Sequence, residues 1–244
     1  MKVLFAGPSI YGANINLASI ELRPPAAHGD LARAVLGGAS AIGLVDGVFE
    51  AIAAVWHKEI LFALQRGVTV AGAASMGALR ASECANFGMI PIGKIAHSYL
   101  DGSLDDDAAV ALIHGPTELG SPPFTDALVD IENTLSIMLN SGCINITEAK
   151  RILENARKTF FKKRTIDSIV SELPNAVYLK QQYKKHFTSQ KQADALELIA
   201  YIKQLPENNI ASPLSWELEQ PHTWTTALKK IADRKQFDQK GEYL

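Results

Sequence analysis

The sequence has few cysteines, few aromatic residues and no long apolar run, and these shortages exclude several classes of protein. Its 244 residues include only Cys84 and Cys143, too few for a small secreted fold held by disulfides. No segment approaches the roughly 18 apolar residues of a membrane-spanning helix. The apolar run after Met1 is also too short for a signal peptide. We therefore expect a cytoplasmic protein with reduced thiols and no membrane partner.

Net charge is also small, at −2, so no global field favours binding to nucleic acid. The charge is nevertheless uneven. Residues 1–140 hold 7 Lys and Arg against 14 Asp and Glu, whereas residues 141–244 hold 17 against 12. Basic residues at 157–164 flank Phe160 and Phe161, a combination that occurs in nucleic-acid binders. The balanced total charge instead favours an exposed helical face or a surface that docks a protein partner.

The first 120 residues alternate between short apolar runs and helical patterns. The runs predict strands at 3–6, 41–45, 68–71 and 110–113, and the patterns between them predict helices at 30–36, 53–65 and 75–85. Continuous apolar runs are typical of parallel strands that are buried on both faces and joined by helical crossovers. We predict an α/β fold with a mostly parallel β-sheet flanked by helices, doubly wound as in Rossmann and flavodoxin folds.

After Pro122 and Pro123 the pattern becomes almost entirely helical. Helix periodicity covers residues 125–140, 147–158, 176–186, 190–204 and 223–236. We therefore predict two domains, an α/β core at 1–122 and a mainly α-helical C-terminal region at 123–244.

Four short segments follow the predicted strands and combine polar residues with Gly or Pro. They are Gly7-Pro8-Ser9, Asp46-Gly47, the segment 72–77 and His114-Gly115-Pro116. Ligands of parallel α/β sheets bind outside the carboxyl ends of the strands, where these segments meet. The sequence therefore predicts a site at this edge.

Ser75 is the most specific feature of that edge. A strand, a turn of small residues, a serine and a helix form the arrangement of a nucleophile elbow, although Ala73 stands where that motif usually has Gly. In this interpretation the helix after Ser75 directs its free N–H groups at an oxyanion. The alternative is that Ser75 only caps the helix, as serine often does.

A serine nucleophile needs a base, which is most often histidine. His114, directly after a predicted strand, is the best placed, and His57 begins a predicted helix. Asp46 can orient either imidazole. Each also has a structural interpretation, as a loop histidine or as a turn aspartate bonded to its own backbone. The candidate catalytic residues are Ser75, His114, His57 and Asp46.

Other residues of the same segments are candidates for substrate binding. Arg80 can bind a carboxylate or pair with Glu83 on the surface, and Lys58 with Glu59 can equally form a solvated helix face. Four aspartates between 101 and 107 lack the spacing of a calcium loop, so we expect a solvated turn there and neither a metal nor another cofactor. The candidate substrate-binding residues are Ser9, Gly47, Glu50, Lys58, Met76, Gly77 and Arg80.

Three runs carry a resemblance to a known family. They are Asp46-Gly47-Val48-Phe49-Glu50, Trp56-His57-Lys58-Glu59-Ile60 and the residues 72–81, GAASMGALRA. Together with Gly7-Pro8-Ser9, residues 23–31 and His114-Gly115-Pro116 they resemble the TfuA-like core domain over roughly residues 1–120. The resemblance implies that the protein acts beside a YcaO enzyme, which uses ATP to activate a backbone amide. The pair is associated with thioamide formation in the biosynthesis of ribosomally made, modified peptides such as bacteriocins.

That resemblance suggests a role for the Ser75 edge. A Ser or His nucleophile there would hydrolyse the thiocarboxylate of a sulfur-carrier protein and release sulfide beside YcaO and its precursor peptide. The alternative is a non-catalytic adaptor or allosteric activator that docks YcaO and its peptide substrate. A generic serine hydrolase is a third possibility, which predicts turnover of simple esters without a partner.

Overall fold

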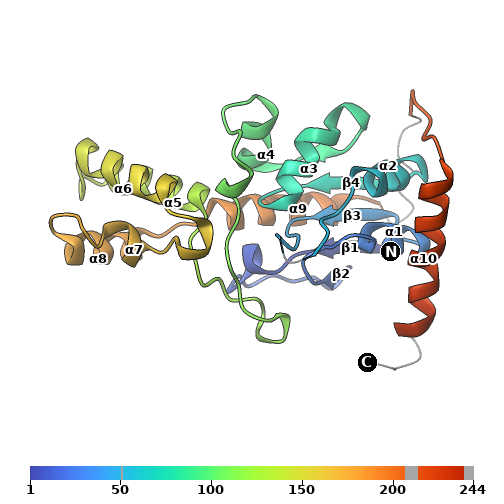
Figure 1. Cartoon of the computed structure of the whole chain (residues 1–244), viewed down its shortest axis with the longest axis horizontal. Coiled ribbons are helices and arrows are strands. Elements are labelled where there is room, and N and C mark those ends of the chain that lie inside the picture. The colour runs from blue at the N-terminus through green and yellow to red at the C-terminus, as the bar shows by residue number, and fades with distance from the viewer. Residues whose placement is uncertain (51, 207–213, 239–244) are drawn as a thin grey trace.

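The computed structural model describes residues 1–50, 52–206 and 214–238, the last six of these by their backbone only. A five-stranded parallel sheet forms its centre (Figure 1). The strands are β1 (Lys2–Phe5), β2 (Ile20–Arg23), β3 (Ala41–Leu44), β4 (Thr69–Gly72) and β5 (Ile90–Pro91). Their order is β2-β1-β3-β4-β5. This order is that of the flavodoxin-like doubly wound folds, so the predicted fold class is confirmed.

The fourth predicted strand, at 110–113, was wrong. Val110 and Ala111 are buried, but they follow a short 3₁₀ helix and pair with no strand. The Ile113 amide donates instead to the Thr125 hydroxyl at 2.8 Å. Conversely, β2 and β5 were missed, because β2 is a half-exposed edge strand and β5 has two residues, one of them a proline. Short edge strands of this kind carry little apolar periodicity.

Opposite faces of the sheet are covered by helices from different parts of the chain. Three helices, α1 (Asp30–Leu36), α2 (His57–Gln65) and α3 (Met76–Cys84), pack on the face that carries Val3, Ile42 and Val70. The other face, with Leu4, Ala41 and Ala71, packs against α9 (Gln190–Gln204). Between β1 and β2 the chain forms only a 3₁₀ helix at Pro8–Ile10 and irregular structure. A helix from the C-terminal half therefore covers the face that this crossover leaves open.

The remaining helices lie at the two ends of the molecule. At one end, α5 (Leu128–Asn140), α6 (Ile146–Lys158), α7 (Ile166–Val170) and α8 (Ala176–His186) share one apolar core, which α4 (Gly93–Leu100) joins (Figure 1). At the other end, α10 (His222–Asp238) packs on α1 and α2 through Trp224 and Ile231. The predicted helical C-terminal region is confirmed. The boundary at residue 122 stays a prediction, although α9 belongs to the core of the sheet.

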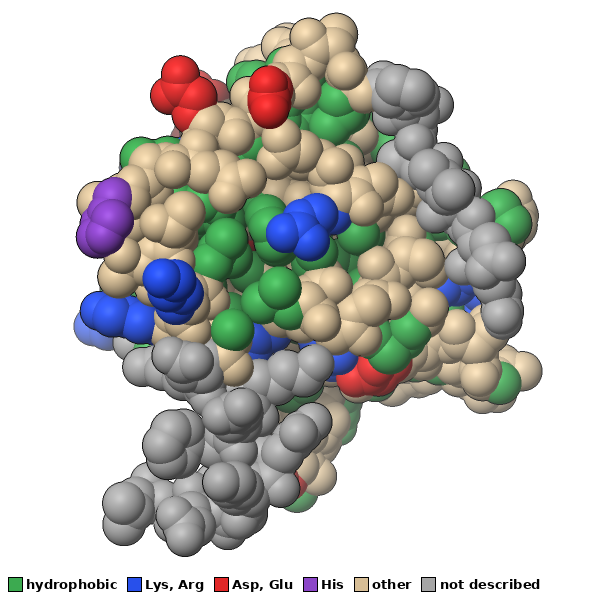
Figure 2. Space-filling view, turned by 90° about the vertical axis from the view of Figure 1, so that its right-hand side faces the viewer, with side chains coloured by type: hydrophobic (Ala, Val, Ile, Leu, Met, Phe, Trp, Pro, Cys, Tyr) green, Lys and Arg blue, Asp and Glu red, His purple; other side chains and the backbone are tan. Residues whose placement is uncertain are grey.

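The surface around α10 shows no concentration of one charge. Figure 2 views the molecule from this end, where basic and acidic side chains are scattered around apolar ones. In the described part of the chain, no helix is both long enough and apolar enough to cross a membrane.

Candidate functional site

Asp46 joins the loops that follow β1 and β3. Its carboxylate is 1% exposed. Oδ2 accepts the N–H groups of Gly7 and Ser9 at 2.8 and 3.0 Å, and Oδ1 accepts the Ser9 hydroxyl at 2.7 Å. Strands β1 and β3 are the pair at which the strand order reverses, the usual place of a ligand crevice in such sheets. Asp46 and Ser9 therefore shape the switch point, and no described hydrogen bond joins Asp46 to a histidine.

Ser75 follows a strained turn. Ala74 has φ 67°, and the Ser75 N–H donates to the Ala73 carbonyl at 2.8 Å, which closes a three-residue turn. A positive φ is uncommon for a residue with a side chain. In a nucleophile elbow the serine sits on the strained turn, whereas here the strain lies one residue earlier. Ser75 occupies the N-cap position of α3, but its half-buried hydroxyl makes no cap hydrogen bond and contacts no described acceptor.

Small residues around Ser75 allow α3 to begin against the sheet. A Cβ on Gly77 would overlap the Leu44 carbonyl oxygen, and a Cβ on Gly72 would overlap the Gly77 carbonyl. The Gly77 N–H donates to the Val45 carbonyl at 3.1 Å. A Cβ on Gly47 would lie 2.7 Å from the Met76 side chain, which is itself buried. Gly47, Met76 and Gly77 thus pack tightly at this edge of the sheet.

His57 and Arg80 come together through Glu83 on the surface of α2 and α3. His57 Nε2 lies 2.8 Å from Glu83 Oε2, and Arg80 Nη1 donates to the same oxygen at 2.5 Å. Arg80 Nε also donates to the Val55 carbonyl at 3.0 Å. The His57 side chain is 51% exposed. This cluster includes the predicted surface pair of Arg80 and Glu83, and no described hydrogen bond connects it to Ser75. The adjacent Lys58 is half-buried and makes no ion pair with a described residue.

The interpretation of Glu59 as part of a solvated helix face was wrong. Its side chain is fully buried, and it accepts the N–H groups of Gly29, Ala32 and Trp56 at 2.9 to 3.3 Å. His28 Nδ1 lies 3.1 Å from the same carboxylate and its ring stacks on Trp56. Glu59 therefore fixes the loop that follows β2, because a buried carboxylate needs several donors.

His114 lies in the loop that was predicted to end a strand. Its ring nitrogen Nδ1 is 2.8 Å from the Gly115 carbonyl oxygen, and the ring is half-buried. No described hydrogen bond joins it to Ser75 or Asp46. Glu50 pairs with Lys162 at 2.5 Å, and this ion pair brings the loop after β3 to the basic segment at 157–164.

The basic segment at 157–164 does not form the single exposed helical face that was one of the two expectations, and a surface that docks a protein partner stays a prediction. Arg164 is 2% exposed and donates to the carbonyl groups of Ala108 and Ala156. Arg157 pairs with Glu132 on α5. Only some of the Lys and Arg side chains of this segment are therefore free to contact a protein partner.

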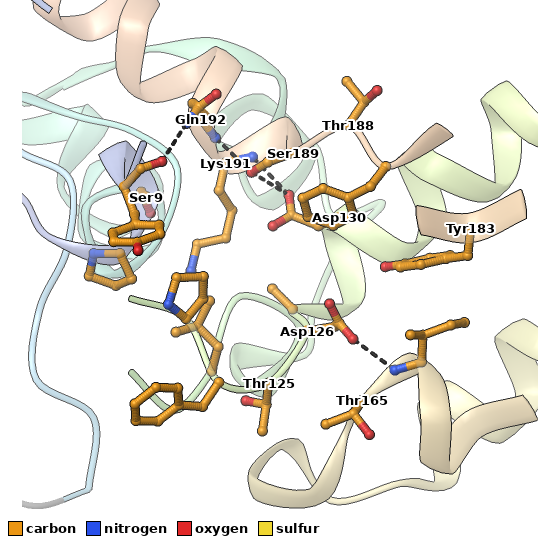
Figure 3. A pocket seen from close by; sticks show the side chains of 18 of the residues that line it. Ser9, Thr125, Asp126, Asp130, Thr165, Tyr183, Thr188, Ser189, Lys191 and Gln192 are labelled. Atoms are coloured by element: carbon orange, nitrogen blue, oxygen red, sulfur yellow. Dashed lines mark hydrogen bonds between the residues drawn. The ribbon is translucent and has the colours of Figure 1, made fainter. Parts of the chain in front are cut away.

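The pocket shown in Figure 3 has a volume of about 920 Å³. It lies between the loop that follows β1 and the helices α5, α7, α8 and α9. It contains charged residues that the sequence analysis did not select. Lys191, in the first turn of α9, is 1% exposed, and its Nζ donates to the Val110 carbonyl at 2.8 Å. Asp130 accepts the Lys191 N–H at 3.0 Å and the Ser189 hydroxyl at 3.1 Å. Asp126 accepts the Ile166 N–H at 2.9 Å.

Burial shifts the titration of all three charged groups. It raises the pKa of Asp126 to about 6, and it raises the pKa of Asp130 against the opposing charge of Lys191. Burial lowers the pKa of Lys191, while the carboxylates of Asp46 and Asp130 oppose that shift. Perturbed groups in a pocket are typical of functional sites.

The sequence offered only a weak signal for these residues. Ser189 caps α9 through its hydroxyl, which accepts the Gln192 N–H at 3.0 Å, so a helix start could be predicted there. The burial of Lys191 comes from the packing of α9 beside the β1 loop, which no local pattern specifies.

Comparison with known proteins assigns part of the chain to a family. Residues 46–165 match the model of the family described as TfuA-like protein. The match includes Asp46, the Ser75 turn, His57 and His114, and it continues past residue 122 into the helical region. No curated protein matches the chain in sequence.

Proposed function

The chain belongs to the TfuA-like family, and from this membership we propose that it assists a YcaO enzyme in backbone thioamidation of a precursor peptide. In this proposal it releases sulfide from the thiocarboxylate of a sulfur-carrier protein by hydrolysis at Ser75. The partners are therefore the YcaO enzyme, the carrier and the peptide, and the proposed compartment is the cytoplasm.

The observation that carries the proposal is that the Ser75 hydroxyl has no hydrogen-bond partner among the described residues. It stands at the N-terminus of α3 without accepting the hydrogen bond that a capping serine normally accepts. The N–H groups of Gly77 and Ala78 bond instead to the backbone carbonyls of Val45 and Ser75. The hydroxyl is thus available, and the strain at Ala74 supports a role beyond capping, since such strain concentrates at functional sites.

The proposed reaction consumes one water and needs no oxidant. Ser75 Oγ attacks the carbonyl carbon of the thiocarboxylate, the C–S bond breaks, and hydrosulfide leaves with the electron pair. Water then hydrolyses the resulting ester, which frees the serine and a carboxylate. The Met76 N–H, which has no partner among the described residues, and the positive end of α3 would stabilise the oxyanion.

His114 is the better of the two proposed bases. With Nδ1 donating to the Gly115 carbonyl, the neutral ring keeps Nε2 as an acceptor for the Ser75 proton. His57 instead directs Nε2 to Glu83. The hydrogen bond from Ser75 to a base would form in the complex with substrate, because catalytic hydrogen bonds often tighten only there.

Sulfide release tests the proposal directly. Purified protein and a thiocarboxylated carrier should yield sulfide, and Ser75→Ala should reduce the rate by about a hundredfold or more, as expected for loss of a nucleophile. Ser82→Ala is the matched control, because Ser82 lies in the same helix and its hydroxyl donates only to the Leu79 carbonyl. Equal rates for wild type and Ser75→Ala would remove Ser75 from the reaction.

The adaptor function is the second candidate, and the histidine contacts favour it. His57 bonds to Glu83, and no described hydrogen bond links either histidine to Ser75. An adaptor predicts that YcaO supplied with free sulfide still depends on this protein, and that Ser75→Ala and His114→Ala support thioamidation as well as wild type does.

A further inference from the structure

The pocket beside Lys191 holds a buried cation whose hydrogen-bonding capacity is only partly used. An ammonium group has three donors. Among the described residues, Lys191 Nζ has one acceptor, the Val110 carbonyl oxygen at 2.8 Å. Figure 3 shows the side chain reaching from α9 into the pocket between Ser9 and Asp126. Because a buried charge is costly unless it is paired and hydrogen-bonded, the remaining donors favour an acceptor from outside the chain.

The acidic groups near Lys191 have their own donors. Asp46 is bonded to the β1 loop through Gly7 and Ser9. Asp130 accepts from the Ser189 hydroxyl and the Lys191 backbone N–H, not from Nζ. Asp126 accepts the Ile166 N–H. These carboxylates supply a compensating field but accept no described hydrogen bond from the ammonium, so two of its three donors have no described acceptor.

The walls of the pocket suit an extended chain. Apolar side chains and hydroxyl groups both line its length, and its volume of about 920 Å³ lies within the range of ligand pockets. The residues that contribute apolar surface or a hydroxyl include Leu112, Ile166, Tyr183, Thr125, Thr165 and Thr188. A lining with both apolar and hydrogen-bonding surface suits a peptide, which has a polar backbone and apolar side chains.

We infer that this pocket binds the C-terminal end of a peptide chain, with the Lys191 ammonium pairing with its terminal carboxylate. The inference rests on the proposed function only for the source of that chain, which is either the sulfur carrier or the precursor peptide. Charge-assisted hydrogen bonds to a carboxylate are among the stronger ones that a lysine makes.

The test compares two surfaces that carry the same randomised pentapeptides, attached by their N-termini and ending in either a free carboxylate or an amide. Wild-type protein should be retained on the carboxylate surface with at least tenfold higher apparent affinity than on the amide surface. Equal retention on both, or none on the carboxylate surface, would overturn the inference.

Two variants localise the binding. Lys191→Met should remove the preference for the carboxylate, while Lys184→Met, a change at an exposed lysine of the same pocket, should keep most of it. Should Lys191→Met fail to fold, Leu196→Trp blocks the pocket from a half-exposed position on α9 and leaves Lys191 in place. A carboxylate preference that persists at full strength in Leu196→Trp would place the binding elsewhere and overturn the inference.

Sulfide release separates this inference from the proposed function. Ser75→Ala should keep the carboxylate preference even where it abolishes sulfide release. Retention of the wild-type protein on surfaces that carry the C-terminal pentapeptide of the carrier or that of the precursor peptide would identify the source of the bound chain. If wild type releases no sulfide at all, the proposed function fails and the peptide comparison still decides the inference.

Discussion

The Ser9 hydroxyl donates to the Asp46 carboxylate at 2.7 Å, and this contact fixes the loops at the switch point of the sheet. The same carboxylate accepts the N–H groups of Gly7 and Ser9, so one buried side chain satisfies three donors. Its first role is therefore to hold the β1 loop against the end of β3, whatever further part it has in chemistry.

Asp46→Ala should lower the free energy of unfolding by about 3 kcal/mol or more, because three buried donors lose their acceptor. Ser9→Ala should lower it by only about 1 kcal/mol, since one hydrogen bond is lost and the backbone contacts remain. Urea denaturation followed by circular dichroism measures both. An Asp46→Ala protein of wild-type stability that releases no sulfide would instead give Asp46 a direct part in the reaction.

Gly77→Ala should prevent α3 from docking on the sheet. The added Cβ would overlap the Leu44 carbonyl, a backbone atom that cannot move without disturbing β3. We expect a loss of more than about 3 kcal/mol, comparable to a severe overpacking substitution. Gly142→Ala is the control, because φ 71° makes it unfavourable by about 1 kcal/mol although its surroundings are open. Thermal unfolding of the two variants should therefore differ clearly, and similar midpoints would contradict the steric argument.

Local patterns predicted most of the helices and the buried strands, but they missed α4 and α7. Apolar residues at 195, 198, 199 and 202 have the spacing of one helix face, so α9 could be predicted, as could β1, β3 and β4 from their apolar runs. The surface that α9 covers could not be predicted, because its partners lie more than a hundred residues away. The strand expected at 110–113 failed for the same reason, since its apolar residues are buried against helices.

The position of two candidate segments in the fold was predicted correctly. The turn at Ser75 and the loop at Asp46 lie where the order of strands places them, at the carboxyl edge. The sequence could not show that Asp46 bonds to Ser9, that His57 bonds to Glu83, or that Lys191 is buried, because each depends on side chains from separate elements.

Leu198 tests how far the two halves of the chain depend on each other. It is fully buried and lies against the β3 glycine, where a Cβ on Gly43 would be 2.7 Å from its side chain. Leu198→Ala should lower the free energy of unfolding by about 2 to 5 kcal/mol, the range for a leucine truncated in a core. Leu196→Ala, at a position 40% exposed on the same helix, should change it by less than about 1 kcal/mol. A separate unfolding transition for the sheet, unaffected by Leu198→Ala, would support independent domains divided near residue 122.

Asp126 makes stability depend on pH between about 4 and 6. Burial raises its pKa to about 6 from 3.8, with Asp130 and Asp167 adding to the shift and Arg164 opposing it. The folded protein therefore holds this proton more tightly than the unfolded chain does. Its contribution to stability is fully present below pH 4 and is lost as the pH rises through 6, by an amount on the order of 3 kcal/mol.

Asp126→Asn should remove this dependence, because an amide oxygen still accepts the Ile166 N–H but carries no charge at any pH. Urea unfolding midpoints measured from pH 4 to pH 7.5 should show the variant more stable than wild type above pH 6, with the difference shrinking toward pH 4. Asp167→Asn is the control, since that side chain is 58% exposed and pairs with Lys180, and its difference from wild type should stay small throughout. A difference between Asp126→Asn and wild type that stays constant over this range would mean that Asp126 titrates at its ordinary pKa.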